Sequence, residues 1–563
     1  MKVRSAAAKN FDPLLIAVLL ATTLFCLHGI GWGRVEDWNR DQMALRPLRG
    51  LRPFFFHKPP FDTYLNHFLV LAPVQAAETI KEWWTGQPQH WNHVRLICSR
   101  LLVLVLVLGT VVLGYVISRR FFGLLAAQVS AIFLGTSAGF IASAHYLSCD
   151  TPLLFFLFAS LFFAQRIVQR GWTRDYFFAG LLAGIATATK YNGLAAGILI
   201  PVAHLLSPNC TSWRRCFFDP KIFVGVAMVP AGFVLGNPYA VIDWRRFVGD
   251  FMYDYEVTPV YGGQHGTGYT AFLHRFGEIL GVPGKIMLFA LVIASAIVLI
   301  WPRLRERERV SGFLLIASFF VLYYLKIGAF ARMPTRFVLP AVPFAILLMG
   351  PFLSRFANYR RWIYALLVPL IFYNLLCSAL VGWRFASDPR LAAQDWMLAH
   401  LRRGQLVESS ATSPRWSLLD ELDMGERKPT EADWRRPLRR GRMVDLRMPT
   451  VNGRSKLFAR ILKGNRWVEA GRHHEGEPDE TLYTEAALRE RNPDYIAIYE
   501  PDTVVPSATV KNYYARLLEG RSSYAIAFDQ DQPKISRNLY PRDIDFLEGR
   551  MTILERRPAI TPQ

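Results

Sequence analysis

Two adjacent acidic residues early in the chain have the chemistry of a proton acceptor. Glu36 and Asp37 follow the first strongly apolar run, and Asp41 comes shortly after them. A carboxylate at a membrane interface can take a proton from an attacking hydroxyl if its surroundings keep it both ionised and basic. The pair therefore predicts a general base. The alternative from the same residues is a solvated flank of the apolar run.

Several cations have positions suited to binding an anion such as a lipid phosphate. Lys58 stands in the aromatic stretch 54–61, from which it could reach a headgroup. Lys190 closes a later apolar run, and Arg332 and Arg336 lie four residues apart. The alternatives are an interfacial aromatic anchor for the first stretch, a residue capping the outer end of a span for Lys190, and outer flank anchors for the two arginines.

Each of the remaining candidate residues has a possible structural role as well as a possible functional one. Asp150 stands where a helix should start, so an N-terminal cap is its simplest role. Asn237 and Tyr239 flank a proline at the end of an apolar run, which is typical of a helix end. His57, His145 and Asp150 could approach one another as metal ligands, but their spacing is unspecific. A divalent metal is therefore left open, and no cofactor is indicated.

Long apolar runs must position these residues. Hydrophobic residues make up 52% of the 563 positions, which is unusual for a soluble protein. A run of about 20 apolar residues can cross a bilayer as a helix that pairs its own backbone groups. We expect eleven such spans, at 13–31, 97–117, 122–141, 149–169, 174–190, 191–207, 221–237, 284–301, 310–327, 334–354 and 361–383.

The distribution of Lys and Arg predicts the orientation of these spans, because positively charged flanks stay on the cytoplasmic side. Basic loops alternate along the chain and fall on the side of the N-terminus: 119–120, 166–174, 214–221, 303–309 and 355–361. The first run shows no small-x-small cleavage site, so it is read as an uncleaved anchor. Topology and anionic headgroups account for much of the net charge of +21, and nucleic-acid binding is unnecessary.

The chain changes character near residue 384. We expect a transmembrane domain over 1–383, with a long outer loop at 31–96, and an outer soluble α/β domain over 384–563. Within the second domain the pattern predicts a helix at 391–401, a strand at 405–407, a strand at 495–499 and a helix at 513–518. The six cysteines all precede residue 384, so this domain must fold without disulfides.

Several motifs in order along 11–400 resemble the membrane glycosyltransferases of family 39. This group includes protein O-mannosyltransferases and the transferase that adds aminoarabinose to lipid A, and its members have the GT-C type of fold. The elements that carry the resemblance are Glu36-Asp37, Lys58-Pro59-Pro60 with Tyr64-Leu65, Arg119-Arg120-Phe121-Phe122-Gly123, Asp150-Thr151-Pro152-Leu153, Thr189-Lys190, Asn237-Pro238-Tyr239 and Arg336-Phe337-Val338-Leu339-Pro340.

The resemblance implies transfer of a sugar from a polyprenyl-phosphate donor to a hydroxyl of a lipid, glycan or protein acceptor. It implies a base at the acidic pair and cations at Lys58, Lys190, Arg332 and Arg336 for the donor phosphate. The family usually has Asp before Glu, whereas this chain has Glu36 before Asp37. By position the base role goes to Glu36, and Asp37 takes a supporting or metal-binding role. A bacterial inner membrane, with the N-terminus cytoplasmic and the tail periplasmic, is the expected location.

A transporter or flippase of lipid-linked sugars is the alternative from a different class. Transporters of that kind often have internal repeats and broken helices near the midplane. The sequence indicates neither feature. A receptor anchored by its spans is a third reading, but eleven spans are excessive for an anchor.

Overall fold

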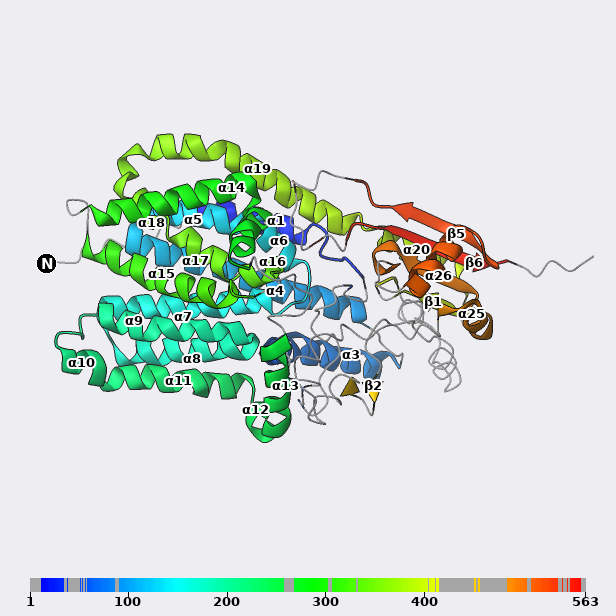
Figure 1. The fold of residues 1–563 in the computed structure, drawn as a ribbon, viewed down its shortest axis with the longest axis horizontal. Helices are drawn as coiled ribbons and strands as arrows, with labels where there is room; N and C mark the ends of the chain where they lie inside the picture. Colours follow the sequence, from blue (N-terminus) through cyan, green and yellow to red (C-terminus); the bar gives the residue numbers. More distant parts are fainter. Residues whose placement is uncertain are drawn as a thin grey trace, which may run out of the picture.

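The computed structural model describes residues 12–34, 38, 51, 53, 56, 58–86, 91–257, 268–301, 306–330, 333–402, 405–410, 412–414, 450–451, 454–455, 483–503, 508–534, 539, 544 and 547–557. Long helices run side by side along the longest axis of the molecule, and a small sheet with short helices lies beyond one end of this bundle (Figure 1). A helical membrane protein with a small C-terminal α/β unit is therefore confirmed.

The helices follow the predicted apolar runs closely. The long or paired helices of the bundle are α1 (Pro13–Leu27), α4 (Asn92–Phe122), α5 (Leu124–Gly135), α6 (Ala138–Ala144), α7 (Asp150–Arg170), α8 (Thr173–Thr189), η3 (Tyr191–Ile198), α9 (Leu199–Leu206), α11 (Pro220–Gly236), α14 (Gly268–Ile300), α15 (Arg307–Ile327), α17 (Ala341–Leu347), α18 (Gly350–Arg355) and α19 (Arg360–Ala386). The shorter connecting helices are α2 (Phe61–Asn66), η2 (His67–Leu71), α3 (Ala72–Thr85), α10 (Trp213–Phe218), α12 (Tyr239–Ile242), α13 (Trp244–Val257), α16 (Thr335–Val338) and η5 (Ala357–Tyr359).

The predicted number of spans is not confirmed. Among the described residues, six helices are long and apolar enough to cross a membrane, or seven if one bent pair counts as a single span. The helices of 13–27, 191–206 and 341–355 are apolar but shorter. The run at 334–354 is divided into α16, α17 and α18, where Pro340 and the Gly350-Pro351 pair interrupt regular helix.

Broken helices are present, a feature that the sequence did not indicate. Helices α5 and α6 meet at an angle of 54° across the break at Thr136 and Ser137. Helix α14 contains Gly281 at φ 75°, a left-handed conformation that suits glycine, two residues before Pro283. Apolarity alone does not show such breaks, because the interrupting residues are themselves small or apolar.

Helices α8 and α11 lie in unusually close contact because glycines line both of them. A Cβ atom added at Gly184 would lie 2.1 Å from the carbonyl oxygen of Val229, and one added at Gly232 would lie 2.2 Å from that of Leu181. Backbones can approach this closely only where side chains are absent, as in many membrane helix pairs. This glycine seam fixes α8, whose last residue precedes Lys190.

The C-terminal unit has a four-stranded sheet in the order β1-β4-β6-β5. The strands are β1 (Val407–Ser409), β4 (Tyr495–Tyr499), β5 (Tyr524–Asp531) and β6 (Arg550–Arg556), with helices α20 (Pro389–His400), α25 (Glu485–Arg491), η7 (Glu500–Thr503) and α26 (Ala508–Leu518), and a separate two-residue pair of β2 (Thr450–Val451) and β3 (Arg454–Ser455). β1 is parallel to β4, and β6 is antiparallel to both β4 and β5. The four elements predicted for this part from the sequence correspond to α20, β1, β4 and α26.

The C-terminal unit and the segment that follows α1 share one junction. The indole N–H of Trp32 donates to Asp388 at 2.7 Å, and the side-chain amide of Gln394 donates to the carbonyl oxygen of Gly33 at 3.1 Å. Arg390 is fully buried, pairs with Asp388 at 2.6 Å and stacks 4.4 Å from the ring of Trp38. The junction therefore holds the chain on both sides of residues 35–37.

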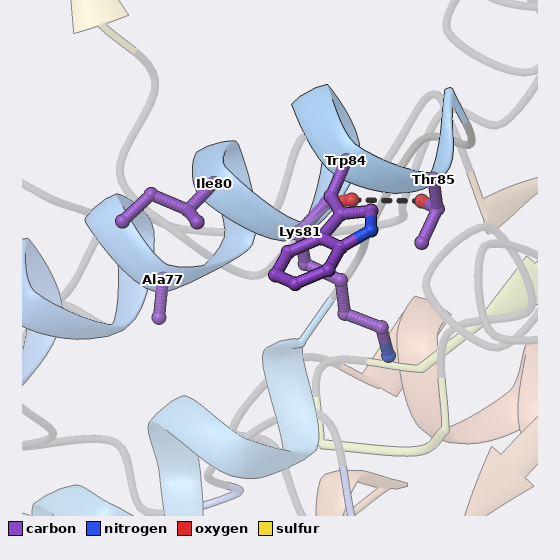
Figure 2. A pocket seen from close by; sticks show the side chains of 5 residues that line it. All are labelled: Ala77, Ile80, Lys81, Trp84 and Thr85. Carbon is purple, nitrogen blue, oxygen red and sulfur yellow. Dashed lines mark hydrogen bonds between the residues drawn. The ribbon is translucent and has the colours of Figure 1, made fainter.

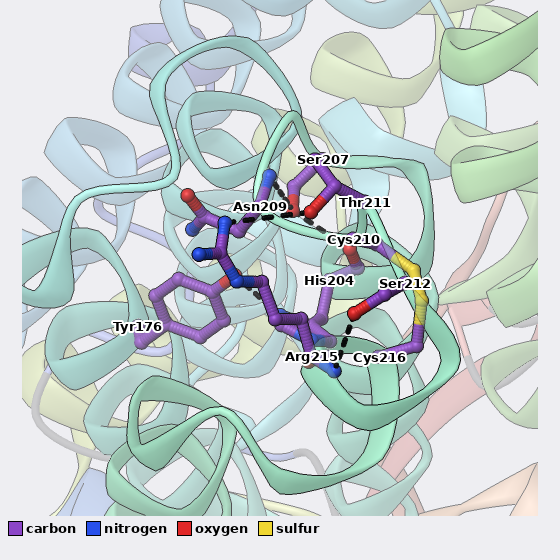
Figure 3. The surroundings of a disulfide bond; sticks show 9 residues. All are labelled: Tyr176, His204, Ser207, Asn209, Cys210, Thr211, Ser212, Arg215 and Cys216. Atoms are coloured by element: carbon purple, nitrogen blue, oxygen red, sulfur yellow. Dashed lines mark hydrogen bonds between the residues drawn. A yellow bond between two sulfur atoms is a disulfide. The ribbon is translucent and has the colours of Figure 1, made fainter.

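The loop between α9 and α11 is closed by a disulfide between Cys210 and Cys216. Figure 3 shows this bond beside a polar group that includes Tyr176 and His204. The hydroxyl of Tyr176 lies 2.7 Å from Nδ1 of His204, and the other ring nitrogen lies 3.0 Å from the carbonyl oxygen of Arg215. These contacts tie the loop to α8 at the end of the bundle far from Lys190.

Candidate functional site

Two charged residues from the candidate set form a buried ion pair. Nζ of Lys190 donates to Oδ1 of Asp150 at 2.6 Å, and the side chains are 14% and 5% exposed. Lys190 directly follows α8 and Asp150 begins α7, so the end of α8 meets the start of the helix that precedes it in the chain. The plain cap reading of Asp150 is wrong by one residue, because Cys149 holds the N-cap position. The carboxylate is turned to the lysine.

A short helix brings a third candidate cation to the same place. The ring of Phe337 on α16 lies 5.4 Å from Nζ of Lys190 and 6.0 Å from the guanidinium carbon of Arg336. Tyr323 on α15 donates its buried hydroxyl to the carbonyl oxygen of Phe337 at 2.8 Å. The hydroxyl of Thr335 contacts Glu278, which also pairs with Arg275 of the same helix, α14. These contacts position α16 against the ion pair.

The segment around Lys58 is held by hydrogen bonds to distant parts of the chain. The backbone N–H of Phe56 donates to Asp250 on α13 at 2.8 Å, and the hydroxyl of Tyr191 donates to the carbonyl oxygen of Phe56 at 2.6 Å. Lys58 is half-buried two residues further on. Tyr191 is the residue after Lys190, so one short stretch of chain contacts both parts of the site.

Asp62, on the short helix α2, is a buried acid that the sequence reading missed. Its side chain is 7% exposed, and burial raises its pKa to about 7. The N–H of Thr63 donates to Oδ1 at 2.8 Å and opposes that rise, as does the charge of Lys58, whereas the charge of Asp150 adds to it. The signal was the position of Asp62, four residues after Lys58 and directly after the Lys-Pro-Pro-Phe element.

Two asparagines near α2 are buried without hydrogen-bond partners. Both amide atoms of Asn66 and both of Asn237 lack a partner among the described residues, and the side chains are 1% and 0% exposed. Asn66 follows Asp62 by four residues, and a Cβ atom at Gly236, next to Asn237, would lie 3.0 Å from the ring of Phe61. Buried polar groups without partners are costly, and they are often found where a ligand binds.

The other predicted residues fall into two groups. Glu36, Asp37, His57 and Arg332 lie outside the described residues. Tyr239, on α12, lies within electrostatic range of the hydroxyl of Tyr64, which donates to the carbonyl oxygen of Leu51 at 2.9 Å.

A metal site is not formed by the part of the chain that the structure describes, where no three His, Cys, Asp or Glu side chains are grouped as ligands. The ring nitrogens of His145 lie 2.8 Å from the carbonyl oxygens of Ile141 and His28. His145 therefore has a structural role.

One surface hollow involves none of these residues. It encloses about 350 Å³ and is lined by Ala77, Ile80, Lys81, Trp84 and Thr85, all from α3 (Figure 2). Among the described residues, no second element forms an opposing wall to this hollow. A cavity of about 20 Å³ between α4, α6, α7 and α17 includes Ser143 and Thr151 in its lining. Because it is the size of a single water, it cannot hold a substrate.

The polar cluster thus contains Lys58 and Lys190, the acids Asp62 and Asp150, and Arg336 close by. Asp150 neutralises Lys190, and the raised pKa of Asp62 keeps much of that acid neutral near pH 7. Such a cluster can bind an anion and stabilise negative charge that develops on it.

A family model matches residues 93–235, about a quarter of the chain. It describes the dolichyl-phosphate-mannose-protein mannosyltransferases, so the resemblance inferred from the sequence is confirmed over this part. The matched part contains Asp150 and Lys190. No curated protein matches the chain.

Among solved structures, ArnT from Cupriavidus metallidurans bound to undecaprenyl phosphate is similar at 14% identity and a TM-score of 0.45, with 98% of this chain and 99% of that chain covered. The archaeal oligosaccharyltransferase AglB from Archaeoglobus fulgidus, in complex with an inhibitory peptide and a dolichol-phosphate, has 12% identity, a TM-score of 0.41, and 86% and 69% coverage. The S. cerevisiae protein O-mannosyltransferase Pmt1-Pmt2 complex bound to the sugar donor has 16% identity, a TM-score of 0.29, and 42% and 34% coverage.

Proposed function

We propose that this membrane protein, whose residues 93–235 match a family of lipid-phosphate-dependent glycosyltransferases, transfers a sugar from a polyprenyl-phosphate donor to an acceptor hydroxyl at the outer face of the membrane. The observation that carries the proposal is the position of the buried Asp150–Lys190 pair inside the matched part, with further cations beside it. Lipid, glycan and protein hydroxyls all remain acceptor classes.

The proposed reaction is a displacement at the anomeric carbon of the donor sugar. The acceptor oxygen forms a bond to that carbon, the bond from the carbon to the phosphate oxygen breaks, and a carboxylate takes the hydroxyl proton. Glu36 or Asp37 is the proposed base. The polyprenyl phosphate leaves with an additional negative charge, which Lys58, Arg332 and Arg336 stabilise, while Lys190 is held for the same task by Asp150.

The location follows from the charge pattern of the loops. We propose an inner bacterial membrane, a cytoplasmic N-terminus, and a boundary near residue 384 after which the C-terminal unit is periplasmic. That unit could contribute to the choice of acceptor. A flippase is the alternative from the sequence, and the family match favours transfer.

The test is sugar transfer by purified protein in lipid nanodiscs. Lipid that co-purifies is first identified by mass spectrometry, and a polyprenyl phosphate or its sugar-bearing form is expected. The sugar-bearing lipid is then incubated with membrane extract, and labelled sugar is followed into acceptor.

The assignment of the base is tested with variants in the same assay. Glu36→Gln and Asp37→Asn are compared with Glu82→Gln, an exposed acid on α3. Transfer should be lost in at least one of the first two and kept in the third; normal transfer in both sinks the assignment of the base.

A further inference from the structure

The acid on α2 has one carboxyl oxygen that is not engaged by the protein. The N–H and, more weakly, the hydroxyl of Thr63 both point to Oδ1 of Asp62, at 2.8 and 3.5 Å. Among the described residues no hydrogen bond reaches Oδ2. The carboxyl group is thus held through Oδ1, and Oδ2 can form a hydrogen bond to a ligand.

The charges around Asp62 determine which form of the acid suits an anion. Lys58 and Asp150 act on Asp62 directly, Cys149 at the start of α7 lies within range of it, and Lys190 acts through its pair with Asp150. Ionisation of Asp62 adds one negative charge to this group, and that charge opposes the binding of an anion.

We propose that Asp62 is a donor-binding residue whose neutral carboxyl group hydrogen-bonds to the phosphate of the lipid donor beside Lys58. The inference rests on the proposed function and adds a residue to its donor site. A neutral carboxyl can donate a hydrogen bond to a phosphate oxygen, whereas a carboxylate can only accept one and repels the phosphate. Asn66, one helical turn further on, offers a buried amide with no partner among the described residues to the same ligand.

The sign of the expected pH effect follows from this arrangement. Burial raises the pKa of Asp62 to about 7, so the acid is mostly neutral at pH 6 and mostly ionised at pH 8. An anion binds the neutral form more tightly, and binding therefore weakens as the pH rises between these values. Lysine side chains stay charged throughout this range.

The experiment measures binding of a short-chain polyprenyl methyl phosphate, a diester with one negative charge at both pH values, to the full-length protein in nanodiscs. For the wild type, the affinity should fall about tenfold from pH 6 to pH 8, because the neutral fraction of an acid with a pKa of about 7 falls by that factor and only the neutral form is expected to bind. For Asp62→Asn, which keeps a donor and cannot ionise, the change should be less than about twofold, since the acid that is expected to cause the pH effect no longer titrates. Asp62→Ser is a second neutral replacement, and Glu82→Gln should behave like the wild type.

Each outcome separates the two proposals. An undiminished pH effect in both Asp62 variants overturns the role of Asp62 and leaves the proposed function standing. An Asn variant that folds, as judged by size exclusion and thermal unfolding, but binds the diester at neither pH also overturns it. A wild type that binds no diester at either pH while remaining folded removes the proposed function and this inference with it.

Discussion

At the residue scale, the buried ion pair between Asp150 and Lys190 makes a direct prediction. Asp150→Asn or Lys190→Gln alone leaves the partner charge buried without compensation, which should cost about 3 kcal/mol of unfolding free energy. The double variant removes both charges and should lose less than the sum of the single changes. Thermal unfolding of the four proteins in one detergent measures this coupling. Additive losses would mean that the pair is not coupled in solution.

The same residues show what the sequence could predict of the site. Residue type and order made candidates of Lys58, Asp150, Lys190 and Arg336. In the structure Lys190 pairs with Asp150, and both Lys190 and Arg336 lie against the ring of Phe337. Asp62 was missed because its stretch, Phe-Asp-Thr-Tyr-Leu-Asn, has the composition of an exposed amphipathic turn. Its burial comes from packing of α2 against distant helices, which local sequence does not encode.

At the scale of elements, the glycine seam between α8 and α11 predicts a sharp difference between two alanine substitutions. Gly184→Ala places a methyl group 2.1 Å from a backbone oxygen of α11, so the helices must separate. The free energy of unfolding should fall by about 1 to 3 kcal/mol. Gly197→Ala adds the same methyl group where no atom lies within 4 Å.

The measurement for this pair of variants is the fraction of monodisperse protein that survives heating, followed by size exclusion. Gly197→Ala should match the wild type, and Gly184→Ala should lose most of its signal at lower temperature. Equal behaviour of the two variants would contradict the closeness of the seam.

Apolar runs predicted the position of most helices but not their continuity. The runs at 97–117, 149–169 and 310–327 correspond to the long helices α4, α7 and α15. The sequence did not predict the break between α5 and α6 or the non-helical conformation of Gly281, because the length and hydropathy of a run do not determine the φ and ψ angles within it. Gly180 and Gly184 stand four residues apart in the sequence, but the helix that packs against them could be found only from the fold.

At the scale of the whole molecule, the proposed orientation predicts which sites an impermeant maleimide reaches in spheroplasts. Glu82→Cys on α3 should be labelled, because it is exposed on the proposed outer side, and Arg307→Cys at the start of α15 should not. The native protein gives the background, since its free cysteines are buried apart from the partly exposed Cys98. The reverse pattern would invert the topology.

The labelling also bears on the disulfide. Cys210 and Cys216 lie on the side proposed to face the cytoplasm, where thiols are generally kept reduced. This observation opposes the orientation read from the basic loops, and the labelling result decides between them.

The junction at Trp32 has a consequence for proteolysis. A cut at Ser387, between α19 and α20, breaks the chain but leaves Asp388 and Gln394 bound to Trp32 and Gly33. Ile544 and Leu547, near the C-terminus, also remain packed in one apolar cluster with Trp32, Trp38 and Phe385. The two fragments should therefore migrate together in native gels and separate only in denaturant, so a nicked molecule would pass unnoticed through purification.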